Sequence, residues 1–176
     1  VNLDRAKERL GGAPLDTWDI VFKPENLAKF ADCGVHMLDA ADELIPTALN
    51  WLGLNPDSKD TADIEKAGAA LAALRPHVKK FHSSEYINAL ANGEICLAVG
   101  WSGDILQARE RAREAAAGTG KKAANIAYVL PKEGAHTWFD SFAIPKDAPH
   151  PEAAHAFIDY MLRPEVAARN TNAVSY

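Results

Sequence analysis

Acidic and aromatic side chains occur close together at several points along the sequence. Such pairs suit an ammonium ligand, because a carboxylate replaces the water that the cation loses and aromatic faces surround its charge and its methylene groups. Burial of a cation without a paired anion would be prohibitive. Taken singly, each side chain also fits an ordinary role, such as a core tryptophan, a helix cap or an acidic first turn. The candidates of this kind are Glu43, Trp101, Asp104, Trp138, Asp140 and Tyr176.

A second chemistry is suggested by the segment Gly100-Trp101-Ser102-Gly103-Asp104, which lies between an expected strand and an expected helix. This context resembles the Gly-x-Ser-x-Gly turn that carries the nucleophilic serine of α/β-hydrolases. Asp104 stands where the second glycine is required, however. Because Asp140 and His155 follow in the order of a Ser-Asp-His triad, a small hydrolase that uses Ser102 is the enzymatic alternative.

Neither the cysteines nor the histidines have the spacing of a local metal site. Cys33 and Cys96 are the two cysteines, and they fit either a single disulfide or two buried thiols. No Cys-x-x-Cys and no His-x-x-x-His pattern occurs. We therefore expect no metal and no cofactor.

The composition is that of a folded, mildly acidic protein. The 176 residues include 19 basic and 24 acidic side chains, which give a net charge of −5, and 48% of the residues are hydrophobic. That apolar fraction is enough for a core, whereas the dispersed basic residues argue against nucleic acid as a partner. No apolar run approaches the roughly 18 residues of a membrane span. The sequence begins at Val1 without a signal segment, so we expect a mature form, an excised domain or a fragment.

The order of the predicted elements indicates an α/β fold. Short apolar runs between turn residues predict strands, and longer amphipathic segments with capping residues predict helices. Alternation of the two favours a three-layer sandwich, with a central mixed sheet and helices on both faces. Ligands usually bind at the strand ends of such sheets. The expected strands are residues 35–38, 78–81, 95–99, 126–129 and 141–144, and the expected longer helices are 39–52, 60–74, 83–92, 104–117 and 151–162, with another beginning at 164.

A series of short motifs is similar to the polyamine-binding proteins of bacterial ABC importers, most of all to those that bind putrescine. The similarity covers essentially all 176 residues in collinear order, which makes it far more specific than any single motif. The motifs are Asp32-Cys33-Gly34-Val35, Leu38-Asp39-Ala40 with Glu43, Ala48-Leu49-Asn50-Trp51-Leu52-Gly53, Phe81-His82-Ser83-Ser84-x-Tyr86-Ile87, Leu90-Ala91-Asn92-Gly93-x-Ile95-Cys96, Gly100-Trp101-Ser102-Gly103-Asp104, Pro131-Lys132-Glu133-Gly134, and Phe139-Asp140 followed by Ala143-Ile144-Pro145.

The resemblance implies a type II periplasmic binding protein, in which two α/β lobes joined by a hinge clamp the ligand. Residues 1–176 then correspond to the second lobe alone, without the first lobe and the hinge. Cys33 and Cys96 match a cysteine pair that is disulfide-bonded in the putrescine-binding relative. Trp138 stands where such proteins usually have phenylalanine, which keeps an aromatic wall but leaves the length of the ligand open.

The same resemblance implies ligand contacts and partners. Asp104 and Asp140 would meet ammonium groups, and Glu43 would bind from the start of its helix. Trp101, Trp138 and Tyr176 would enclose the methylene chain. The expected function is periplasmic binding of a polyamine, putrescine before spermidine, for delivery to the permease subunits of an ABC importer, without catalysis. Another organic cation or an amino acid is the alternative ligand, and an isolated lobe is expected to self-associate through its aromatic cleft face.

Overall fold

The computed structural model describes residues 1–120 and 122–174, which divide into two compact units, residues 1–136 and 137–176. The elements of the first unit, in chain order, are α1 (Leu3–Leu10), α2 (Asp19–Phe22), α3 (Pro24–Leu27), η1 (Ala28–Phe30), β1 (Val35–Met37), α4 (Ala41–Trp51), α5 (Thr61–Leu74), η2 (Arg75–His77), β2 (Lys80–Phe81), α6 (Tyr86–Ala91), β3 (Leu97–Ala98) and α7 (Ser102–Ala117). Helices α8 (Pro151–Met161) and α9 (Pro164–Val174) belong to the second unit.

A small parallel sheet forms the centre of the first unit. Its strand order is β2-β1-β3, with Met37 opposite Phe81 and Val35 opposite Leu97. Three of the predicted strands are thereby confirmed in position. The antiparallel part of the predicted mixed sheet appears only as an isolated bridge between Asn2 and Ile126.

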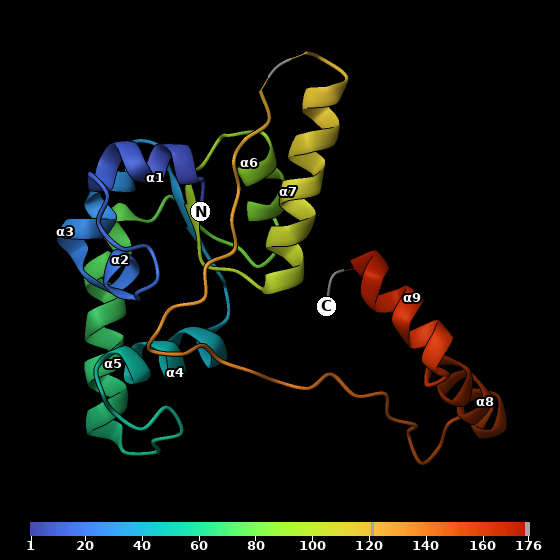
Figure 1. The fold of residues 1–176 in the computed structure, drawn as a ribbon. Coiled ribbons are helices and arrows are strands. Elements are labelled where there is room, and N and C mark those ends of the chain that lie inside the picture. The colour runs from blue at the N-terminus through green and yellow to red at the C-terminus, as the bar shows by residue number, and fades with distance from the viewer. Residues whose placement is uncertain (121, 175–176) are drawn as a thin grey trace. The chain divides into compact units, whose positions relative to one another are not determined.

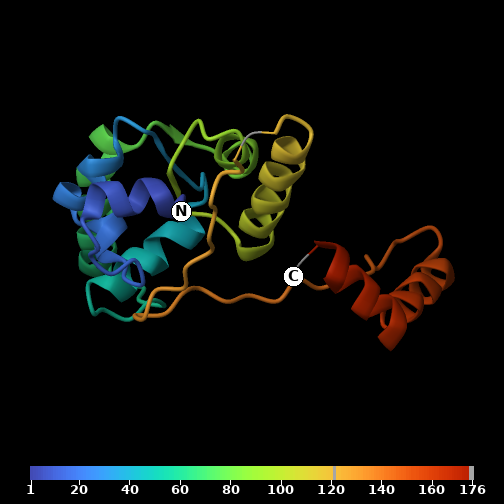
Figure 2. The same cartoon turned by 45° about the horizontal axis from the view of Figure 1, so that its top comes forward.

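Helices cover both faces of this sheet (Figure 1 and Figure 2). Because side chains alternate along a strand, Val35 and Met37 share one face of β1, and they pack into a core cluster with side chains of α2, α4 and α5. Leu38 belongs to a second cluster, which is built mainly from α6 and α7. The three-layer α/β arrangement expected from the sequence is therefore present in residues 1–136.

The disulfide between Cys33 and Cys96 lies at the amino ends of β1 and β3. Its two Cα atoms are 5.8 Å apart, and the cysteines are separated by 63 positions in the sequence. The structure therefore confirms the pairing that the family resemblance implied, and it excludes the alternative of two buried thiols.

Two of the predicted strands are wrong. Residues 126–129 contribute only the bridge at Ile126, and residues 141–144 form no regular element. A strand requires a neighbouring strand to receive its backbone hydrogen bonds. The described residues of the second unit provide none, because their regular elements are the helices α8 and α9.

The second unit buries little of its apolar surface within itself. None of its described residues falls in the buried class, and Phe142 packs edge-to-face on Phe157 with the ring centroids 5.7 Å apart. Phe139 is 91% exposed. Within the described part of the chain, no helix combines the length and the apolar character needed to cross a membrane.

Candidate functional site

Two of the predicted acidic residues lie at the starts of helices that follow adjacent strands, at the carboxyl edge of the sheet. Helix α4 follows the end of β1, and helix α7 follows the end of β3. Because β1 and β3 are adjacent and parallel, the N-termini of both helices lie at the same edge. Glu43 is in the first turn of α4, and Asp104 is in the first turn of α7.

Tyr86 fixes the geometry around Asp104. Its ring is fully buried at the start of α6, and its hydroxyl donates a hydrogen bond of 2.6 Å to Asp104 Oδ2. The same hydroxyl accepts a bond of 3.3 Å from the backbone N–H of Trp101, the N-cap residue of α7. One buried phenol therefore ties the predicted aromatic residue and the predicted carboxylate to the core.

Gly100 is required by this arrangement. A Cβ atom at this position would lie 2.5 Å from Cε2 and 2.9 Å from Oη of Tyr86, closer than such contacts occur. The absence of a side chain at Gly100 lets the phenol approach the turn between β3 and α7. The glycine thus serves close packing at this point.

Glu43 is held by a residue that the sequence did not single out. Its side chain is 17% exposed, and its Oε2 atom lies 2.9 Å from Nδ1 of His136. His136 is the last residue of the first unit. Helix α4 has no side-chain cap, because its N-cap residue is Ala40. The carboxylate of Glu43, in the first turn of this helix, is bonded to the imidazole of His136.

The segment that precedes His136 is anchored on α2 and α4. Glu133 accepts hydrogen bonds from the hydroxyl and backbone N–H groups of Thr17 and Trp18, and the Asn50 side chain donates to its backbone carbonyl over 2.9 Å. Burial alone would raise the pKa of Glu133, but the bond from Thr17 and the backbone bonds hold that pKa below its ordinary value. These bonds fix the backbone just before His136 and so place His136 next to Glu43.

The remaining predicted ligand contacts are not among the described residues of the first unit. Trp138 and Asp140 belong to the second unit, in the extended segment before α8, and Tyr176 lies outside the described residues. Ser102 is the first residue of α7, whereas His155 is on α8 in the second unit. The first unit thus brings Glu43, Trp101 and Asp104 to one edge of its sheet.

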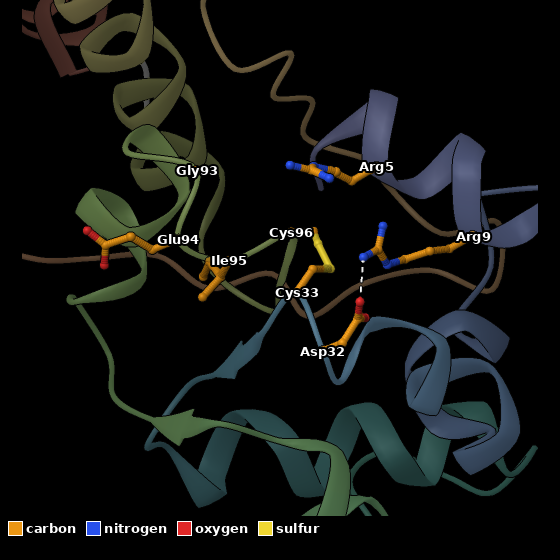
Figure 3. A pocket seen from close by; sticks show the side chains of 8 residues that line it. All are labelled: Arg5, Arg9, Asp32, Cys33, Gly93, Glu94, Ile95 and Cys96. Carbon is orange, nitrogen blue, oxygen red and sulfur yellow. Dashed lines mark hydrogen bonds and ion pairs between the residues drawn. A yellow bond between two sulfur atoms is a disulfide. The ribbon is translucent and has the colours of Figure 1, made fainter.

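A shallow hollow lies at the opposite, amino edge of the sheet. Its lining includes the disulfide and two arginines of α1, and Figure 3 shows Arg9 turned toward Asp32, with 2.9 Å between Nη2 and Oδ2. The hydrogen bond from Arg9 lowers the pKa of Asp32. Among the described residues, none of the predicted ligand contacts of the first unit lines this hollow.

No group of three or more His, Cys, Asp or Glu side chains among the described residues could hold a metal ion.

Sequence reasoning missed Tyr86 and His136 as parts of the site. A glycine directly after a buried strand, as at Gly100, signals that another group approaches the backbone closely, and this signal could have indicated a large neighbour. For His136 no such local signal exists, because its partner Glu43 is 93 positions away.

The sequence matches the family of bacterial extracellular solute-binding proteins over residues 1–176. It is 48% identical to the putrescine-binding periplasmic protein PotF of Escherichia coli, over 99% of this chain and 46% of that protein. It is 46% identical to the putrescine-binding periplasmic protein SpuD of Pseudomonas aeruginosa, over 99% of this chain and 47% of that protein. The chain therefore spans about half the length of the curated relatives it matches.

Solved structures agree with this assignment. The spermidine/putrescine ABC transporter substrate-binding protein PotD of Streptococcus pneumoniae superposes with a TM-score of 0.69 at 29% identity, over 97% of this chain and 48% of that one. The Tp0655 (TpPotD) lipoprotein of Treponema pallidum gives a TM-score of 0.74 at 24% identity, over 97% and 50%, and supports the fold alone. The matched family consists of binding proteins, so the hydrolase interpretation of Ser102 is not supported. The chain belongs to the bacterial extracellular solute-binding proteins.

Proposed function

We propose that this chain binds a polyamine, putrescine before spermidine, in the periplasm and supplies one side of the binding cleft of an ABC importer's binding protein. The observation that carries the proposal is the pair of carboxylates, Glu43 and Asp104, at one sheet edge beside Trp101. Support comes from relatives at 46–48% identity that are named as putrescine-binding periplasmic proteins. No chemical reaction is part of the proposed function.

The chemistry of this edge suits a primary ammonium group. Asp104 is partly exposed, and the hydrogen bond from the Tyr86 hydroxyl to Oδ2 holds its carboxylate. A carboxylate is the charged acceptor that pairs with an ammonium group. Trp101 is also partly exposed, and its ring offers an apolar and cation-attracting face. We assign the second set of contacts to Asp140, Trp138 and Tyr176, on the basis of the motifs that they occupy.

We further propose that residues 1–176 represent the second lobe of a two-lobe protein. In that arrangement the first lobe covers the carboxyl edge and excludes water, and the permease subunits of the importer receive the ligand. Without closure, a charge pair at an exposed edge contributes only about 0–1 kcal/mol. We therefore expect residues 1–176 alone to bind polyamine poorly and to self-associate through exposed aromatic side chains.

Titration calorimetry of the full-length protein with putrescine, cadaverine and spermidine tests the proposal. Asp104→Asn keeps an acceptor for Tyr86 but removes the charge, so we expect a loss of about 2–5 kcal/mol of binding free energy, as for a desolvated charge pair. Asp57→Asn is the matched control, because Asp57 is an exposed residue of the loop after α4. Unchanged affinity in Asp104→Asn, or preference for an amino acid over every polyamine, would refute the assignment.

A further inference from the structure

The carboxylate of Glu43 is satisfied on one side only. Oε2 is bonded to His136, whereas Oε1 makes no hydrogen bond with the described residues. Oε1 is not buried, so solvent reaches it. The Glu43 side chain is only 17% exposed, and its bond to His136 holds one of its two carboxylate oxygens in place.

The backbone on both sides of this bond is fixed. Glu43 lies in the first turn of α4, where its own N–H donates to the carbonyl of Ala40 over 3.2 Å. His136 follows an anchored segment, in which Trp18 Nε1 donates to the carbonyl of Gly134 over 2.8 Å. Two independently held elements therefore meet at the contact between Nδ1 and Oε2, and neither side chain needs to search for the other.

We propose that His136 is the positioning residue that orients Glu43 toward the ligand's ammonium group. This inference rests on the proposed function, because it assigns a role within the same polyamine site. The imidazole donates its Nδ1–H to Oε2, which leaves Oε1 directed to an incoming N–H donor. In this role His136 contacts Glu43, and its contribution to binding acts through that carboxylate.

The donor role makes a prediction that does not require ligand. A histidine whose Nδ1 is bonded to a carboxylate must carry the proton on Nδ1 when it is neutral. Nitrogen NMR of the full-length protein, labelled at histidine, reports the tautomer directly. We expect the Nδ1–H form for His136, and a predominant Nε2–H form would overturn the proposal.

Calorimetry with putrescine then tests the effect on binding. Loss of one hydrogen bond that orients a carboxylate predicts that His136→Ala weakens binding about three- to tenfold. His136→Asn places an amide N–H donor near the position of Nδ1 and should recover most of this loss. His77→Ala is the control, because it removes a histidine of η2, away from the carboxyl edge, and should leave the affinity unchanged.

A double-mutant cycle separates positioning from a general structural effect. In a Glu43→Gln background, His136→Ala should change the affinity by less than about twofold, because the group through which it acts has been altered. Equal effects in both backgrounds, or an unchanged affinity in the single variant, would refute the role of His136 while leaving the proposed function intact. Failure of the wild-type protein to bind putrescine would refute the proposed function and, with it, this role.

Discussion

Replacement of Tyr86 by phenylalanine removes a single hydroxyl that joins two parts of the candidate site. That hydroxyl donates to Asp104 over 2.6 Å and accepts from the Trp101 N–H over 3.3 Å, from a ring that is fully buried. A hydrogen bond to a charged group contributes about 1.5–3 kcal/mol, and a neutral one about 0.5–1.5 kcal/mol. Because Asp104 is partly exposed, its bond belongs at the lower end of that range. We expect Tyr86→Phe to lower the free energy of unfolding by about 2 kcal/mol.

Urea and thermal unfolding followed by circular dichroism measure this loss. In a chain of this length 1 kcal/mol corresponds to about 2–4 °C, so the midpoint should fall by about 4–8 °C. Tyr128→Phe is the matched control, since that side chain is 40% exposed and its hydroxyl makes no hydrogen bond with the described residues. The control should shift the midpoint by less than about 1 °C, as expected of a surface substitution.

The reasoning predicts a second effect that stability alone does not produce. Without the hydroxyl, the Asp104 carboxylate loses the hydrogen bond that positions Oδ2, so putrescine affinity of the full-length protein should fall even at temperatures where the variant is fully folded. If Tyr86→Phe unfolds at the same urea concentration as Tyr128→Phe, the hydroxyl does not hold the turn between β3 and α7, and Tyr86 does not stabilise the candidate site.

Three further substitutions test other parts of the structure. Gly100→Ala forces a methyl group onto the ring of Tyr86 and should destabilise the fold by about 1–3 kcal/mol, measured by urea unfolding; wild-type stability would contradict the close packing. Joint replacement of Cys33 and Cys96 by alanine opens a loop of 63 positions and should lower the free energy of unfolding by at most about 4 kcal/mol. Two alkylatable thiols in the untreated wild-type protein would show that the disulfide is absent. Burial lowers the pKa of His36 below its ordinary 6.5, so the unfolded chain binds the proton more readily and stability should decline as the pH falls below about 6.5; His36→Gln should flatten this part of the pH profile, and an unchanged slope would exclude His36 as its source.

The parts of the fold that were predictable are those determined by local patterns. The runs at 35–38, 78–81 and 95–99 are short and apolar, stand between turn residues, and contain the three strands of the sheet. The run at 141–144 has the same appearance, but a strand also depends on a partner, and no pattern within the run specifies one. Helix boundaries came within a few residues because capping and turn residues are local as well.

In the candidate site too, the features that depend on local sequence were predictable and the contacts between distant residues were not. Trp101 and Asp104 could be placed at a strand end, since they follow a buried run directly. The hydrogen bonds of the Tyr86 hydroxyl to Asp104 and Trp101 could not be predicted, because they depend on how α6 packs against α7 and on the space left by Gly100. The bond between Glu43 and His136 joins residues 93 positions apart, and sequence spacing carries no information about such a contact.

The position of the disulfide has a consequence for how the chain folds. Cys33 stands two residues before β1 and Cys96 one residue before β3, so the covalent bond holds together two strands that are far apart in the sequence. Pairing of such distant strands is slow, because the chain loses the entropy of closing a long loop before the contacts between the strands stabilise it. An oxidised chain that has unfolded retains this closure, so the residues next to the starts of β1 and β3 stay together. Refolding of the oxidised protein therefore begins with the starts of β1 and β3 already held close, whereas the reduced protein must first bring them together by diffusion.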